Sequence, residues 1–149
     1  MMDEVETKLN ILIDCLRKKE NALTEIANIT LNQENVLENR ELFHAMNTEK
    51  QTHIKIVLQC DTMFERILKE IGPMLDANPS LYKDPIKVLQ EYIRRVMDLD
   101  VNIRVHEEQN NMKLQRQKMV PKDKPIVINT QTNAQVIKSY AENVKKSKG

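Results

Sequence analysis

Apolar residues recur along the first quarter of the chain at alternating steps of four and three residues. This spacing places side chains on one face of a helix that packs as a coiled-coil strand does. Asp3, with Glu6 three residues later, resembles a capping box and predicts that the helix opens at Asp3. Ten positions form this first stripe and seven of them are apolar: Val5, Leu9, Leu12, Leu16, Lys19, Leu23, Ile26, Thr30, Gln33 and Leu37.

A second stripe starts in a new phase after Asn39, which can cap a new helix. The positions that would continue the first stripe are polar, so the two stripes belong to separate helices. Gly72-Pro73 predicts the end of the second helix, which from 40 to 71 would be about 48 Å long. Eight of the ten positions in this stripe are apolar: Phe43, Met46, Lys50, His53, Val57, Cys60, Phe64, Ile67, Ile71 and Met74.

A loop and a third helix follow. Residues 76–83 are rich in turn formers, and Asp84-Pro85 reads as an N-cap followed by a first-turn proline. Beyond Val105 the pattern is mostly polar, so this end either overhangs the core or pairs with polar neighbours, before prolines 121 and 125 terminate it. The apolar positions of the third helix are Ile86, Leu89, Ile93, Val96, Leu99 and Ile103.

The C-terminal part divides into a linker at 120–132 and an amphipathic segment at 133–149, after a helical bundle at 1–119. An isolated helix over 133–146 is marginal in water, so it forms when docked, either on this body or on a partner. The predicted fold is all-α: an elongated antiparallel bundle of three long helices, a linker and a short C-terminal amphipathic helix. One face of that last helix carries Val136, Ile137, Tyr140 and Val144.

Composition agrees with helices and excludes several functions. The 149 residues include two glycines and five aromatic residues, too few for an all-β domain, and glycine only at 72 and 149 excludes glycine-rich nucleotide-binding loops. Residues 1–112 hold 14 basic and 20 acidic side chains, whereas residues 113–149 hold 9 and 2. A basic tail suits an acidic partner, an anionic membrane, nucleic acid or the acidic body itself. With Tyr140 as its only aromatic residue, nucleic-acid binding is disfavoured.

No arrangement of residues predicts catalysis, a metal or a cofactor, so we expect the chain not to be an enzyme. Glu41 and His44 have the spacing of a di-iron ligand pair, but no second copy exists. His53 lies about 10 Å along the helix axis from Cys60, too far for a catalytic pair. Cys60 and Cys15 read as buried reduced thiols.

Recognition through apolar surface remains as the chemistry the chain offers. Its eight methionines provide adaptable apolar side chains for that purpose. The N-terminus is acidic, where a signal peptide would be basic and then apolar, and no stretch reaches the roughly 18 apolar residues of a membrane span. We therefore expect a cytoplasmic protein without membrane insertion, as a monomer or a homodimer.

Residues 5–115 resemble the FlgN-type flagellar export chaperones, to which the FliT-type chaperones are close in kind. The segments that carry this resemblance are Asn32-Gln-Glu-Asn-Val-Leu37, Glu49-Lys-Gln51, Asp61-Thr-Met-Phe64 and Glu107-Glu-Gln-Asn110. The resemblance implies a chaperone that binds a terminal amphipathic helix of hook-associated axial proteins, prevents premature polymerisation and delivers them to the export apparatus. It also implies that Val136, Ile137, Tyr140 and Val144 form the contact face. A coiled-coil adaptor or structural homodimer, and a chaperone of another secretion system, remain the alternatives.

Overall fold

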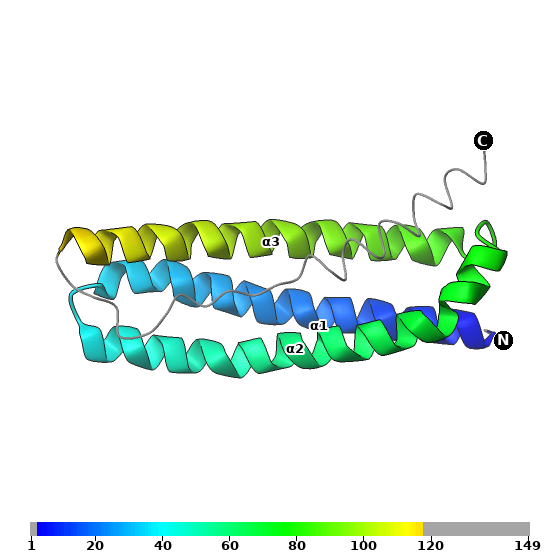
Figure 1. The fold of residues 1–149 in the computed structure, drawn as a ribbon, viewed down its shortest axis with the longest axis horizontal. Helices are drawn as coiled ribbons and strands as arrows, with labels where there is room; N and C mark the ends of the chain where they lie inside the picture. Colours follow the sequence, from blue (N-terminus) through cyan, green and yellow to red (C-terminus); the bar gives the residue numbers. More distant parts are fainter. Residues whose placement is uncertain (1–2, 118–149) are drawn as a thin grey trace.

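A computed structural model describes residues 3–117, which form three long helices and one 3-10 turn, with no strand in that range. These are α1 (Glu4–Gln33), η1 (Glu34–Val36), α2 (Arg40–Ala77) and α3 (Lys83–Arg116). Figure 1 shows the helices side by side along one long axis, with α2 running opposite to α1 and α3. At 1.5 Å per residue, the 38 residues of α2 extend about 57 Å. The predicted all-α bundle of three long helices is confirmed; the predicted linker and C-terminal segment lie outside the described residues.

Helix α1 is the element that holds the bundle together. All ten positions of its predicted stripe are buried, from Val5 to Leu37, the last of which lies just past η1. The predicted cap is also present, because the backbone N–H of Glu6 donates to Oδ1 of Asp3 over 2.7 Å. Helix α1 makes close backbone contacts with both α2 and α3, and in Figure 1 it lies between them.

The chain reverses between α1 and α2 where the phase of the pattern breaks. Asn39 has an extended backbone and its side chain accepts a hydrogen bond from the N–H of Leu42 at 3.1 Å. Leu37 is buried beneath the turn. The predicted cap and the predicted start of the second helix are both confirmed.

The predicted stop at Gly72-Pro73 is wrong, because α2 continues to Ala77. A proline inside a helix removes one backbone hydrogen bond and bends the helix rather than always ending it. Figure 1 shows the C-terminal end of α2 turning across towards the start of α3. Beyond the proline, Leu75 is 3% exposed and continues the core, whereas Met74, the predicted core position, is 44% exposed. Packing of this last turn therefore outweighs the cost of the proline.

Helix α3 begins at Lys83, so Asp84 lies in the first turn instead of capping the helix. The residue at the N-cap position, Tyr82, is buried, and its hydroxyl donates to Oδ2 of Asp3 at 3.3 Å. This contact ties the α2–α3 loop to the start of α1. At the other end, α3 stops at Arg116, and its polar part pairs with polar neighbours, one of the two predicted possibilities.

The apolar core is densest near the α2–α3 loop, a region we call the loop end. Fifteen buried apolar residues form one cluster there: Val5, Leu9, Leu12, Cys15, Leu16, Cys60, Phe64, Ile67, Leu68, Ile71, Leu75, Tyr82, Ile86, Leu89 and Ile93. A smaller cluster occupies the middle of the bundle: Ala22, Leu23, Ile26, Val57, Val96 and Ile103. None of the helices that the structure describes is both long and apolar enough to cross a membrane.

Candidate functional site

The residues predicted to contact a partner, Val136, Ile137, Tyr140 and Val144, lie outside residues 3–117. Their arrangement as one face stays a prediction. The described part of the chain offers two exposed apolar surfaces, a set of buried polar contacts and two buried thiols.

The first apolar surface runs along the outer side of α3. Met97, Val101, Val105 and Met112 are 39 to 57% exposed. Steps of four, four and seven residues place them on one side of a helix, so they form a continuous strip, the α3 strip. Apolar residues of this size that line up on a surface can pack against an amphipathic helix.

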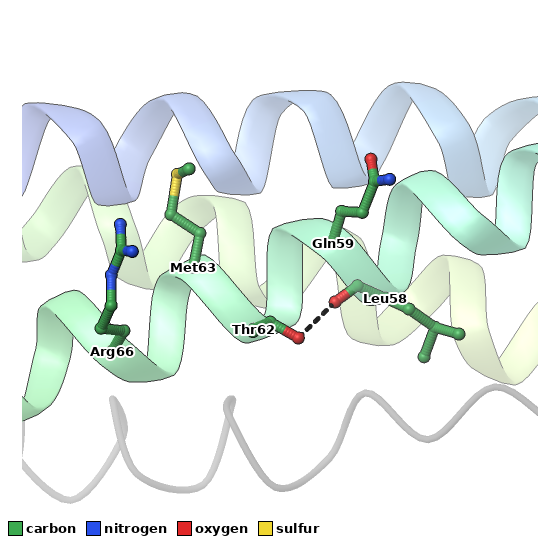
Figure 2. Close-up of a pocket in the computed structure, with 5 residues that line it drawn as sticks. All are labelled: Leu58, Gln59, Thr62, Met63 and Arg66. Atoms are coloured by element: carbon green, nitrogen blue, oxygen red, sulfur yellow. Dashed lines mark hydrogen bonds between the residues drawn. The ribbon is translucent and has the colours of Figure 1, made fainter.

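The second apolar surface is an open groove on the outer side of α2 with a volume of about 370 Å³. Within residues 3–117, the side chains that line it come from α2, as Figure 2 shows: Leu58, Gln59, Thr62, Met63 and Arg66. Leu58 and Met63 are 56% and 43% exposed, and the hydroxyl of Thr62 donates to the carbonyl of Leu58 at 3.0 Å. Because apolar surface lies beside the Arg66 guanidinium, the groove suits a partner segment that carries an apolar side chain next to an acidic one.

Two lysines predicted to interrupt the apolar stripes are buried in the bundle and paired with carboxylates. Lys19 of α1 pairs with Asp61 of α2. Nζ of Lys50, on α2, lies 3.0 Å from Oε1 of Glu107 on α3. Burial lowers the pKa of Lys50 from its usual value, although the negative charge of Glu107 opposes that shift. These pairs join α1 to α2 and α2 to α3, and polar residues buried in a helical seam can favour one register of the helices over others.

Further polar contacts join the helices at the end opposite to the loop. The side chain of Gln33 donates to Oδ1 of Asn47 at 2.8 Å, which links α1 to α2. The side chain of Asn110 donates to the carbonyl of Thr30 at 3.0 Å, which links α3 to α1. All four residues are buried. We call this region, residues 30–56 and 104–116, the hairpin end.

The two cysteines lie in the loop-end cluster as free thiols, as predicted. Cys15 is 5% and Cys60 is 8% exposed, and burial raises the pKa of both thiols. A buried thiol with a raised pKa is a poor nucleophile, because the thiolate is the reactive form. Neither cysteine therefore has the environment of a catalytic or redox-sensing residue.

We expect both thiols in the native protein to react with a disulfide reagent at pH 8 at least about 100-fold more slowly than in the unfolded chain. A Leu58→Cys variant provides the control, because this position is exposed on the same helix. Its added thiol should react at nearly the unfolded rate. Absorbance of the released thiolate measures the reaction rates of the native, the unfolded and the added thiols. If the native thiols reacted as fast as the added one, their burial would be contradicted.

The residues that could hold a metal are dispersed. Glu41 and His44 both lie exposed in the first turns of α2. Within residues 3–117, no group of three or more His, Cys, Asp or Glu side chains could hold a metal ion.

Sequence reasoning missed the buried polar residues of α3. Asp100, Glu107 and Asn110 were not placed in the predicted core of the third helix, yet Asp100 is 2% and Asn110 is 4% exposed. Their signal is the heptad register itself, because steps of three and four from Val96 reach positions 100, 103, 107, 110 and 114. Because these residues are polar, a core chosen by residue type omits them, whereas the heptad spacing includes them.

Fold and surface together define a three-helix bundle with buried interhelical ion pairs and exposed apolar strips. No protein-family model, curated protein or solved structure matches the chain.

Proposed function

We propose that the chain is a secretion chaperone that binds a terminal amphipathic helix of hook-associated axial proteins, keeps it from polymerising and delivers it to the flagellar export apparatus. The single observation that supports binding of a helix is the exposed apolar surface on the body, namely the α3 strip and the α2 groove. The flagellar assignment rests on the resemblance of the four short segments within residues 5–115. Cytoplasmic location and lack of enzymatic activity are parts of the same proposal.

The chemistry of binding follows from the surfaces available. An amphipathic helix buries its apolar face in a groove or against a strip, and each fully buried large apolar side chain contributes about 1.5 to 3 kcal/mol. A chaperone needs this contact to be reversible, so a few such side chains are sufficient. The predicted tail face would supply an additional apolar surface and would enclose the bound helix.

The test measures binding of a fluorescent peptide, a terminal helix of a hook–filament junction protein from the same organism, by anisotropy with the full chain. We expect Val136→Ser/Tyr140→Ser to weaken binding at least about tenfold, because two apolar contacts are lost. The control Lys138→Ala/Glu142→Ala changes the opposite side of the predicted helix without altering net charge and should bind normally.

A second pair of residues separates the tail from the body. Val101→Ser/Val105→Ser removes the middle of the α3 strip. Loss of binding in this variant alone would place the contact on the body and contradict the tail face. Unchanged binding in both variants, or none by the unaltered chain, would reject the proposal in favour of an adaptor or structural dimer. Sedimentation equilibrium would then report self-association.

A further inference from the structure

The two ends of the bundle are held together by different kinds of contact. At the loop end, fifteen buried apolar residues pack together, and the polar contacts beside them, such as Lys8–Glu70, are more exposed. At the hairpin end, α2 contributes only two buried residues over its first 17 positions, Asn47 and Lys50, and both are polar. The facing positions are mixed: α3 has buried Asn110 and Leu114 and nearly buried Glu107, and α1 has buried Ile29, Thr30 and Gln33.

Side-chain contacts across the hairpin end therefore include several hydrogen bonds and ion pairs, beside a few buried apolar residues, Ile29, Leu37 and Leu114. Lys50 to Glu107 joins α2 to α3, Gln33 to Asn47 joins α1 to α2, and Asn110 to Thr30 joins α3 to α1. Lys113 and Glu34 form a further pair in a more exposed position.

Such contacts stabilise a closed bundle less than apolar packing does. On opening, each polar group exchanges its partner for water, so the net gain from a hydrogen bond is small. A buried ion pair recovers in the interior little more than its desolvation costs. Apolar side chains recover nothing from water, and they oppose opening along the whole loop end. Proteins open locally where buried apolar contacts are few.

We propose that the hairpin end is a built-in opening segment: the start of α2 and the end of α3 move away from α1 and from each other in one cooperative step, while the loop end stays folded. The Lys50–Glu107 pair is the latch, because it alone joins α2 to α3 among the contacts named above. Opening would expose Leu37, which lies just past η1, Leu114 of α3 and the neighbouring Ile29 of α1, together with unpaired polar groups. This inference concerns the body alone and does not depend on the proposed function.

Hydrogen exchange of the full chain, followed by mass spectrometry of peptides, tests the opening directly. After correction for intrinsic rates, we expect amides in 44–54 and 105–113 to exchange at least about tenfold faster than amides in 64–71 and 89–96. Amides within the hairpin end should share one opening rate, and their exchange rates should depend equally and only weakly on urea concentration. Protection that instead rises gradually from residue 113 towards residue 100 would indicate ordinary fraying and would overturn the proposal.

Replacing the latch gives the second test. Lys50→Met/Glu107→Leu substitutes apolar side chains for the buried pair, and we expect it to slow exchange across the hairpin end at least about tenfold. The matched control Lys8→Met/Glu70→Leu removes an α1–α2 pair at the loop end, where both side chains are partly exposed, and should leave the hairpin end unchanged. Equal exchange of both ends in the unaltered chain, or faster exchange in the latch variant, would overturn the proposal.

Discussion

Replacing Phe64 with alanine is expected to lower the free energy of unfolding by about 4 kcal/mol. The phenyl ring is 2% exposed within the loop-end cluster, so the substitution removes its transfer free energy and leaves a cavity between α1, α2 and α3. Alanine is the best helix former, so the backbone of α2 does not oppose the change. Urea denaturation followed by circular dichroism at 222 nm measures the effect.

Leu58 on the same helix provides the control for this prediction. It is 56% exposed, and Leu58→Ala should change the free energy of unfolding by less than about 0.5 kcal/mol. Equal losses in the two variants would contradict the assignment of Phe64 to the core. A smaller slope of unfolding free energy against urea would indicate that the bundle no longer unfolds in a single transition.

The three helices and the buried face of the first helix could be predicted from the sequence, because apolar residues at coiled-coil spacing indicate both a helix and the face that it buries. Every position of the first stripe is buried, including Lys19, Thr30 and Gln33, whose polarity would have excluded them from a core chosen by residue type. The caps at Asp3 and Asn39 were predictable for a local reason, since the side chain satisfies an N–H three residues away.

What the sequence misjudged depends on tertiary contacts. Pro73 would end an isolated helix, but burial of Leu75 and the packing of the loop end keep α2 helical to Ala77. The sequence could not decide between an overhang and polar pairing for the end of α3, because the partners of this end lie 57 and 80 residues away in sequence. Local pattern carries no information about such distant partners.

The same separation explains why the candidate binding surface was not foreseen. The residues of the α3 strip share spacing with the core positions of the same helix, and only the placement of α1 decides which face is covered. Val101 and Val105 are exposed because Asp100 and Ile103 take the buried positions beside them. A polar residue is therefore buried while neighbouring apolar residues are exposed. Stability alone does not favour this arrangement, whereas binding of another helix to the exposed residues would explain it.

Replacing Lys50 with methionine is expected to lower the free energy of unfolding by about 3 kcal/mol or more. Methionine matches the aliphatic part of lysine, so packing is nearly kept and the loss reports the charge. Without Lys50 the carboxylate of Glu107, whose side chain is 9% exposed, lies among buried groups without that cation. Lys8→Met is the control, because the exposed Lys8–Glu70 pair should contribute at most about 1 kcal/mol.

The double variant separates the pair from its components. Lys50→Met/Glu107→Leu should regain the stability lost by Lys50→Met and exceed that of the unaltered chain, since apolar residues of similar size that replace a buried ion pair often stabilise a protein. The coupling between the two positions follows from the cycle of the two single variants and the double one. A double variant as unstable as Lys50→Met would mean that the loss came from packing, and the pair would then have no role in closing the hairpin end.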